Sequence, residues 1–293
     1  MDPTLNTPDS LDLPAPAKLN LMLRIVGRRQ DGYHRLQTVF QLLDVGDRLR
    51  LTRRTDGRIR RIRGAPGVAE HEDLVVRAAH CLQERTACPS GCDITVDKRL
   101  PMGGGLGGGS SDAATTLLGL NRLWELGLTL DELAEIGLSL GADVPVFVRG
   151  RSAWGEGIGE CLTPLTLPPA WYVVLCPQVH VATAELFAHP GLTRDAAPIT
   201  MRAFFEGLRD NVFQPLVAAS YPPVAEALGW LSRSGEARLT GTGACLFAAF
   251  ESEATARQVL DRRPVGLEGF VARGVNLSPL HEALGLGIEV NSK

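Results

Sequence analysis

The sequence predicts an α+β protein built from two domains. Its 293 residues correspond to about two domains at the usual ~150 residues each. Segments with the period-2 alternation of strands are mixed with segments whose apolar residues recur at helical spacing. Three prolines within residues 164–169 mark the best candidate linker. We therefore expect domains over residues 14–163 and 170–293, behind a disordered leader over residues 1–13.

The first strand is expected over residues 17–25, where apolar and polar residues alternate. Lys18 and Asn20 then point the same way, and we expect them on the exposed face of this strand. The glycines of the following segment, residues 27–33, indicate a connection to a second strand.

The same patterns predict the rest of the first domain. Strands are expected over residues 34–44, 48–54, 58–63, 92–96, 144–148 and 153–155, and helices over residues 72–86, 110–126 and 129–141. The strands over residues 48–54 and 58–63 flank Thr55, Asp56 and Gly57, which predicts a hairpin with a basic exposed face. Thr129 and Glu132 form a capping box at the start of the third helix.

The second domain shows a similar mixture. Strands are expected over residues 171–176 and 270–275, a strand, a glycine-rich turn and a further strand over residues 238–250, and a helix over residues 253–262. Several short helices are expected between residues 200 and 234. This order predicts a second α+β domain.

Composition and charge exclude several classes of protein. Thirty Lys and Arg against 33 Asp and Glu give a net charge of −3, so the overall field does not attract nucleic acids or acidic membranes. The longest apolar runs, residues 171–176 and 246–250, are far shorter than the ~20 residues that span a bilayer. The N-terminal residues lack the basic and apolar stretches of a secretory signal, which predicts a cytoplasmic location. The six cysteines are expected to be reduced, and Cys81, Cys88 and Cys92 with His80 lack the spacing of a zinc site.

A glycine-rich segment is the strongest functional signal. Glycine occupies six of the seven positions from Gly103 to Gly109, directly before the helix expected at Ser110. Glycine destabilises regular structure by roughly 0.5–1 kcal/mol relative to alanine, so such a run makes sense where the backbone bends tightly around a ligand. Main-chain N–H groups and the helix N-terminus then favour phosphate over a plain flexible loop. The expected ATP-binding residues are Pro101, Met102, Gly103, Gly104, Gly105, Leu106, Gly107, Gly108, Gly109, Ser110 and Ser111.

Two familiar nucleotide folds do not fit this segment. A dinucleotide-binding unit would follow its helix with a strand that ends in an acid ~20 residues beyond the glycines, whereas Leu130 begins another helix. A P-loop would end in Gly-Lys-Ser/Thr, whereas this segment ends in Gly109, Ser110 and Ser111.

Three ordered motifs resemble those of the superfamily of galactokinase, homoserine kinase, mevalonate kinase and phosphomevalonate kinase, the GHMP kinases. They are PAKLNL at residues 16–21, PMGGGLGGGSSDAA at residues 101–114 and LTGTGA at residues 239–244. Residues 27–44 and 141–150 further resemble the branch that acts on 4-diphosphocytidyl-2-C-methyl-D-erythritol. The resemblance implies an N-terminal nucleotide-binding domain, a ferredoxin-like C-terminal domain and an active site in the cleft between them.

The implied reaction is ATP-dependent phosphorylation of the 2-hydroxyl of that substrate, a step of the non-mevalonate route to isoprenoid precursors. The resemblance makes Asp143 the base that accepts the hydroxyl proton, and Lys18 the cation that keeps Asp143 ionised and stabilises the phosphoryl group. ATP is expected with Mg²⁺, and no tightly bound cofactor is expected. Ser111 at the helix start is a candidate Mg²⁺ ligand, but the sequence does not fix the ligands. From the residues alone, Asp143 could equally end a helix, and Lys18 could be a solvated surface lysine.

The resemblance also implies a cytidine site. It places Tyr33 and Phe187 against the cytosine ring, His34 and Lys98 in polar contact with the base, and Asn20 and Thr183 nearby. One residue departs from the family: Asp73 stands before Leu74 where an Asn is common near the adenine, so an amide donor is lost.

Two alternatives remain open at this point. Another GHMP kinase, of the homoserine or mevalonate type, would share the glycine-rich segment but has no reason to carry Tyr33 or Phe187. The second alternative is a nucleic-acid-binding module. Eight of the sixteen residues from Arg48 to Arg63 are arginine, and such a module would use them to bind phosphates. Most arginine-rich runs of this kind are instead solvated edges of a sheet. We expect a small-molecule substrate, no nucleic-acid or membrane partner, and a monomer or weak homodimer.

Overall fold

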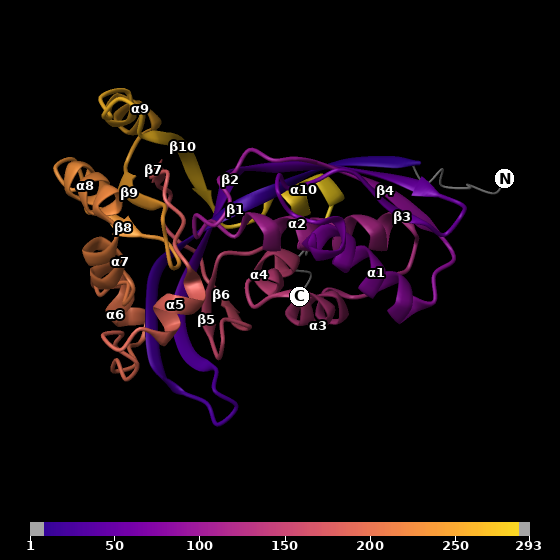
Figure 1. The fold of residues 1–293 in the computed structure, drawn as a ribbon, viewed down its shortest axis with the longest axis horizontal. Coiled ribbons are helices and arrows are strands. Elements are labelled where there is room, and N and C mark those ends of the chain that lie inside the picture. Colours follow the sequence, from indigo (N-terminus) through magenta and orange to yellow (C-terminus); the bar gives the residue numbers. More distant parts are fainter. Residues whose placement is uncertain (1–8, 287–293) are drawn as a thin grey trace, which may run out of the picture.

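The structure is a computed structural model that describes residues 9–286. The molecule is elongated, and the N-terminal and C-terminal halves of the chain lie toward opposite ends of two long strands (Figure 1). Its elements are, in chain order, β1 (Ser10–Arg28), β2 (His34–Arg54), β3 (Ile59–Arg63), the 3₁₀ helix η1 (Glu70–Glu72), α1 (Leu74–Thr86), β4 (Gly91–Asp97), α2 (Gly108–Leu123), α3 (Leu130–Leu140), α4 (Val144–Arg149), β5 (Ala153–Glu156), β6 (Cys161–Pro164), β7 (Trp171–Cys176), α5 (Thr183–Ala188), α6 (Met201–Phe205), α7 (Gln214–Ser220), α8 (Pro222–Leu231), β8 (Arg238–Leu239), β9 (Leu246–Phe250), α9 (Glu253–Asp261), β10 (Glu268–Val275) and α10 (Pro279–Leu284).

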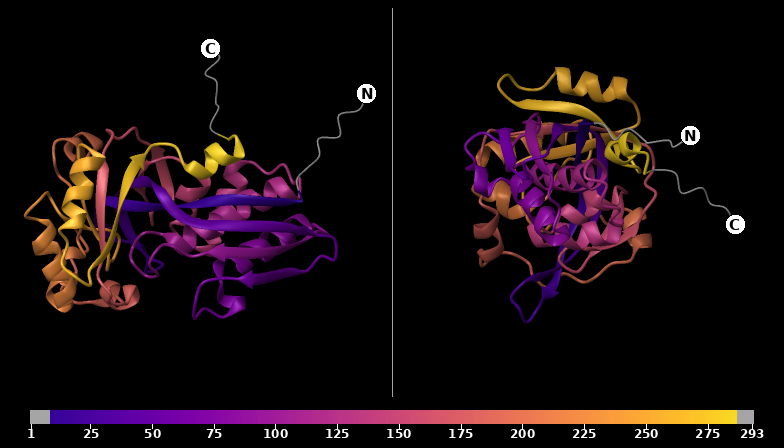
Figure 2. Two further views of the ribbon diagram at one scale, coloured as in Figure 1. Left: turned by 90° about the horizontal axis from the view of Figure 1, so that it is seen from above. Right: turned by 90° about the vertical axis from the view of Figure 1, so that its right-hand side faces the viewer.

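Strand β2 connects the two halves of the molecule. One edge of β2 pairs with the antiparallel β1 along most of its length, and the two strands run side by side along the molecule in the left view of Figure 2. The other edge pairs in succession with β5, β10 and β4. The longest path through the sheet is therefore β3-β4-β2-β10-β7-β9-β8, so strands of both halves belong to one sheet.

Helices cover the sheet in both halves and enclose three apolar clusters. In the N-terminal half, α1, α2, α3 and α4 pack with β1, β2 and β4. In the C-terminal half, α5, α7, α8 and α9 pack with β7, β8 and β9. A third cluster joins β1 and β2 to β7 and β9 at the centre. The expected α+β architecture is confirmed, and none of the helices within residues 9–286 is long and apolar enough to cross a membrane.

The last helix of the described chain returns to the N-terminal half. Leu280 and Leu284 of α10 belong to the apolar cluster of that half, and α10 contacts β1. His281 is buried, and its Nε2 lies 2.8 Å from the carbonyl oxygen of Val148. Its ring covers Gly150, where a Cβ would lie 2.1 Å from the imidazole. The domain boundaries at residues 163 and 170 remain a prediction. Helix α10 comes after residue 170 in the sequence but packs in the N-terminal half.

The predicted hairpin over residues 48–63 is wrong. Both arginine-rich strands pair with β4 instead: β2 pairs with it antiparallel and β3 parallel, so β4 lies between them. The charges explain this order, because Asp93 of β4 accepts hydrogen bonds from Arg54 on one side and lies 3.6 Å from Arg60 on the other. Like charges on directly paired strands would destabilise the sheet.

Residues 144–148 form helix α4, where a strand was predicted. All five residues are buried, so they show neither strand nor helix periodicity. A short apolar run cannot be assigned from its pattern alone. Pro145 occupies the first turn of the helix, where its missing N–H costs nothing.

Other differences concern the ends of elements. Residues 10–13 were predicted within a disordered leader but belong to β1, and Leu13 is buried. The first eight residues lie outside the described part of the chain. Helices α5 and α10 were not predicted, since each has only six residues. The capping box of Thr129 and Glu132 is confirmed at α3.

The burial of His281 predicts a pH dependence of stability. Burial lowers the pKa of His281, with the hydrogen bond to Val148 opposing this and Arg151 adding to it. Because the unfolded chain binds the proton more readily, stability falls as the pH drops below the ordinary histidine pKa of ~6.5. The melting temperature should therefore fall more steeply between pH 7.5 and pH 5.5 in the wild type than in His281→Gln. Equal slopes in the two proteins would contradict this role.

Candidate active site

Lys18 is buried, with 2% of its surface exposed. Its ammonium lies 3.2 Å from Asp143 Oδ2 and donates hydrogen bonds to Asn20 Oδ1 at 2.5 Å and to the carbonyl of Gly105 at 3.1 Å. An ammonium group removed from water needs such oxygen partners to offset its lost hydration. The predicted pairing of Lys18 with Asp143 is thus present in the geometry.

The prediction that Lys18 and Asn20 lie on an exposed face is wrong. The backbone N–H of Lys18 donates to the carbonyl of Leu106, and the backbone N–H of Asn20 donates to Thr240 Oγ1. The Lys18 ammonium also contacts the carbonyl of Gly105, and a Cβ on Gly241 would lie 3.6 Å from Asn20 Oδ1. The glycine-rich segment and the segment before β9 therefore cover these side chains. Strand alternation indicates which residues share a face but does not reveal what packs against it.

Asp143 lies at a boundary between two elements, as predicted, although the element that follows it is the helix α4 and not the predicted strand. Gly141 ends α3, and Asp143 stands immediately before α4. Its side chain is 35% exposed, so the carboxylate contacts Lys18 and also reaches solvent. A carboxylate in this position can accept a proton from a bound hydroxyl group.

The glycine-rich segment passes directly over Lys18. Gly105 has φ +76°, and a Cβ there would lie 2.2 Å from the carbonyl oxygen of Thr240. Gly107 has φ +72°, and its Cβ would lie 2.8 Å from the ring of Phe147. Both the left-handed backbone and the close packing require glycine at these two positions.

Residues 239–244 hold the middle of the glycine-rich segment from the other side. Thr240 Oγ1 donates to the carbonyl of Gly105 at 3.1 Å, and the N–H of Cys245 donates to the carbonyl of Gly104 at 3.1 Å. The three sequence motifs, far apart in the chain, therefore meet at Gly105.

Helix α2 begins at Gly108, two residues earlier than predicted, with Gly107 as its N-cap. Its first turn contains Ser111, which is fully buried and whose Oγ has no hydrogen-bond partner among the described residues. The free N–H groups and positive dipole of a helix N-terminus favour an anion. The unpartnered hydroxyl oxygen of Ser111 suits a phosphate or a hard cation such as Mg²⁺.

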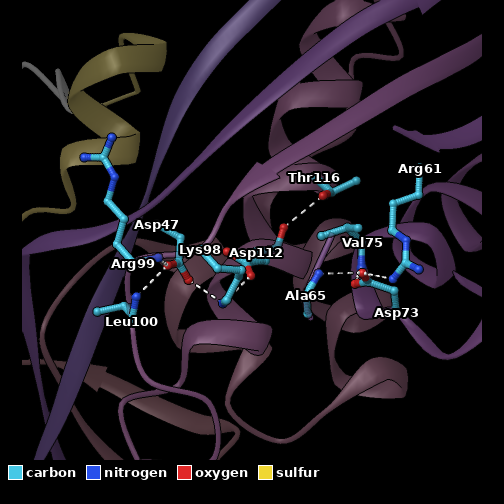
Figure 3. A network of polar contacts seen from close by, with 10 residues as sticks. All are labelled: Asp47, Arg61, Ala65, Asp73, Val75, Lys98, Arg99, Leu100, Asp112 and Thr116. Atoms are coloured by element: carbon cyan, nitrogen blue, oxygen red, sulfur yellow. Dashed lines mark hydrogen bonds and ion pairs between the residues drawn. The ribbon is translucent and has the colours of Figure 1, made fainter. Parts of the chain in front are cut away.

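Lys98 does not lie with the predicted cytosine-binding rings. Its ammonium lies 2.5 Å from Asp47 Oδ2 and 2.8 Å from Asp112 Oδ2, on the left in Figure 3. Asp47 is in the second half of β2, whereas His34 begins that strand. The predicted contact of the Lys98 side chain with the cytosine therefore does not fit this structure, because two buried carboxylates hold the ammonium elsewhere.

Burial and neighbouring charges shift the pKa values of Asp112 and Lys98. Burial raises the pKa of Asp112 to about 7, and Asp47 and Asp73 add to the rise, while Lys98 opposes it. Burial alone would lower the pKa of Lys98, yet the two carboxylates outweigh it and the pKa lies above its usual value. Asp47 and Asp112 were not predicted, since nothing in the pattern around them distinguishes a buried acid from a surface one.

Three of the predicted cytidine residues, Tyr33, His34 and Phe187, lie at the start of β2. The rings of His34 and Phe187 stack with centroids 5.1 Å apart, and Phe187 also packs edge-on against Phe213. Tyr33 is 61% exposed, in the loop that projects between β1 and β2 (Figure 1). Burial lowers the pKa of His34, to which Arg194 and Arg28 contribute, and its buried Nε2 has no described hydrogen-bond partner.

Thr183 connects this region to the catalytic motifs. Its hydroxyl lies 2.8 Å from the hydroxyl of Thr242, which belongs to the segment that contacts Gly105. The structure thus places Thr183 beside residues 239–244 and His34 against Phe187. Asn20 lies with Lys18 rather than with the rings, where its Nδ2 donates to Thr38 Oγ1.

Asp73 has a structural role of its own. Its carboxylate caps α1 by accepting from the N–H of Val75 and forms an ion pair with Arg61 at 2.7 Å, on the right in Figure 3. An aspartate at an N-cap stabilises the helix, and Arg61 balances its buried charge. Asp73 carries a charge that the Asn common at this position would lack, and Arg61 of β3 pairs with that charge.

Neither of two hollows on the described surface is at this site. One, of about 730 Å³, lies between α1, β3 and α3, and the other, of about 400 Å³, lies between α2, α3 and α10. Among residues 9–286 there is no group of three or more His, Cys, Asp or Glu side chains arranged to hold a metal ion.

Comparison with known proteins agrees with this geometry. Residues 73–151 match the family model of the GHMP kinases N terminal domain, and residues 195–264 match that of the GHMP kinases C terminal. A protein of Alkalilimnicola ehrlichii named 4-diphosphocytidyl-2-C-methyl-D-erythritol kinase is 60% identical over 91% of this chain and 92% of its own length. The protein of the same name from Halorhodospira halophila is 57% identical over 92% of this chain and 95% of its own.

A solved structure with the same activity in its name shares the fold. The crystal structure of 4-(cytidine 5'-diphospho)-2C-methyl-D-erythritol kinase superposes with a TM-score of 0.78 and 31% identity, covering 90% of this chain and 99% of that one. A homoserine kinase from Cytophaga hutchinsonii, at 16% identity and a TM-score of 0.64, shares the fold alone. On this evidence the chain belongs to the GHMP kinases, and within them to the 4-diphosphocytidyl-2-C-methyl-D-erythritol kinase family.

Proposed function

We propose that this chain transfers the terminal phosphoryl group of ATP to the 2-hydroxyl of 4-diphosphocytidyl-2-C-methyl-D-erythritol, giving the 2-phosphate and ADP. The observation that supports this most directly is the Lys18 and Asp143 pair, 3.2 Å apart, beneath Gly105 of the glycine-rich segment. The names of relatives at 57–60% identity supply the acceptor. The reaction belongs to the non-mevalonate route to isoprenoid precursors.

In the proposed mechanism, the buried Lys18 and the partly exposed Asp143 divide the chemistry. The Asp143 carboxylate accepts the proton of the 2-hydroxyl as its oxygen attacks the phosphorus. The Lys18 ammonium stabilises negative charge on the phosphoryl oxygens in the transition state. Asn20 and the carbonyl of Gly105 orient that ammonium through their hydrogen bonds.

Binding of the cytidine is proposed at the start of β2. The stacked pair of His34 and Phe187 offers an aromatic surface, and the unpartnered His34 Nε2 offers a polar contact. Tyr33 is exposed enough to close over the other face of the base. Lys98 is left out of this site, since its ammonium is held by Asp47 and Asp112.

ATP is proposed to bind with Mg²⁺, for which the buried hydroxyl of Ser111 is the best oxygen ligand that this chain offers at the helix N-terminus. The cation would neutralise charge on the phosphates. A cytoplasmic location and a monomeric or weakly dimeric state remain predictions from the sequence.

The nucleic-acid alternative has less support. Five of the eight arginines between Arg48 and Arg63 form ion pairs with aspartates, which neutralise much of the basic surface. The residues of the glycine-rich segment and the Lys18 pair would also have no role in such a module.

Removal of the charge of Lys18 or of Asp143 should lower kcat severely but leave nucleotide binding intact. Asp143→Asn removes the base and Lys18→Met removes the cation at similar volume, so kcat should fall by about 10²–10⁴-fold in each variant. Calorimetric titration with a non-hydrolysable ATP analogue should still show binding.

Arg24→Met is the matched control, because Arg24 lies on the same strand and pairs with Asp210 outside the site. Its kcat should equal that of the wild type. Near-normal turnover in Asp143→Asn or Lys18→Met would refute the assigned roles.

Loss of the exposed Tyr33 ring should weaken binding of the cytidine substrate but not binding of ATP. Stacking on a base is worth roughly 1–3 kcal/mol, so Tyr33→Ala should raise the KM for the cytidine substrate by about 5-fold or more and leave the KM for ATP unchanged. Steady-state kinetics with each substrate varied in turn would measure this.

Phe205→Ala serves as the control, because Phe205 is likewise an exposed aromatic but lies on α6. In the same assay, homoserine and mevalonate should release no ADP. Efficient phosphorylation of either would favour the other GHMP kinases.

Divalent cation should be required. EDTA should stop ADP release and added MgCl₂ should restore it, and Ser111→Ala should raise the Mg²⁺ concentration needed for half-maximal rate several-fold. Turnover in excess EDTA would exclude the requirement. An unchanged Mg²⁺ dependence in Ser111→Ala would exclude Ser111 as a ligand.

A further inference from the structure

The ammonium of Lys98 is used neither by the proposed chemistry nor by the proposed cytidine site. It lies in a largely buried group with two carboxylates, Asp47 and Asp112, which are both buried (Figure 3). Replacing a buried ion pair by apolar residues is often neutral or stabilising, so such a group is weak evidence for a role in stability alone. Its position in the chain indicates another role.

The group holds the start of the glycine-rich segment. Asp47 Oδ1 accepts hydrogen bonds from the backbone N–H groups of Arg99 at 2.5 Å and Leu100 at 2.8 Å. Its other oxygen accepts from Lys98. One buried carboxylate of β2 thus fixes three consecutive residues immediately before Pro101.

The group also holds the end of the segment. Lys98 donates to Asp112 Oδ2, and Asp112 lies in the first turns of α2. A Cβ on Gly108, the first residue of the helix, would lie 3.3 Å from the Lys98 ammonium. Lys98 therefore links the residues before the glycines to the helix after them.

The middle of the segment is held separately. Gly105 and Leu106 are bound by Lys18, and Gly104 by Cys245. Glycines lose more conformational entropy on folding than other residues, so a run with free ends would be ordered only on binding a ligand, at the expense of affinity.

We propose that Lys98, Asp47 and Asp112 are positioning residues that hold both ends of the glycine-rich segment in place before ATP arrives. They act through the backbone of residues 99–112, which forms a ready cradle for the phosphates. This inference rests on the proposed function only in taking ATP as the ligand of the segment.

The experiment compares Asp112→Asn with the double variant Lys98→Met, Asp112→Asn. Lys98→Met alone would leave two buried carboxylates facing each other, whereas the double variant leaves only Asp47, which keeps its two backbone donors. Calorimetric titration with a non-hydrolysable ATP analogue should show at least 10-fold weaker binding for the double variant, and less than about 3-fold for Asp112→Asn. The KM for the cytidine substrate should not change.

Amide hydrogen exchange distinguishes positioning from direct contact. Without ligand, residues 99–112 should exchange faster in the double variant than in the wild type, while the rest of the chain is unchanged. Arg54→Met, which removes an arginine held by Asp56 and Asp93 at the far end of β2, should alter neither binding nor exchange in this segment.

Two results would overturn the inference. Wild-type affinity in the folded double variant would show that the link is unnecessary. Weaker binding with unchanged exchange would show that Lys98 contacts the nucleotide itself. Because binding is measured without an acceptor, either result is independent of whether the proposed phosphorylation occurs.

Discussion

The arrangement of the candidate site depends on the burial of one lysine ammonium. Lys18 cannot leave water without oxygen atoms around it, and it obtains them from β1, the glycine-rich segment and the residue before α4. Asn20, Gly105 and Asp143 are remote from one another in sequence, so the same cation that would act on a phosphoryl group also brings the site together. Structural and chemical requirements therefore coincide at this residue.

The long strand β2 gives the site a rigid frame. Its pairing with β1 along one edge, and with β5, β10 and β4 along the other, makes one continuous sheet of both halves. The stacked rings of His34 and Phe187 lie at its start, Asp47 lies in its second half, and Lys18 is on the neighbouring strand. A substrate with a nucleotide at one end and a hydroxyl at the other suits sites spread along such a strand.

Buried or half-buried aspartates recur as partners of basic groups in the N-terminal half. Asp93 separates two arginine-rich strands, Asp73 pairs with Arg61 at the start of α1, and Asp47 and Asp112 enclose Lys98. In each case the charge pair joins segments that are separate in the chain. The arginine-rich segment is accordingly a structural feature of the sheet, and its basic character is largely neutralised.

The sequence by itself determined the α+β class, most helices and strands, the glycine-rich segment before a helix, the capping box of α3 and the pairing of Lys18 with Asp143. These depend on local periodicity, on residue chemistry and on motifs whose spacing survives in the chain. Tertiary structure decided the remainder: that β4 lies between the arginine-rich strands, that residues 144–148 are helical, that Lys18 is buried, and that Lys98 faces Asp47 and Asp112 rather than a base. Burial and long-range charge pairing cause these features, and both depend on residues distant in sequence that no local pattern encodes.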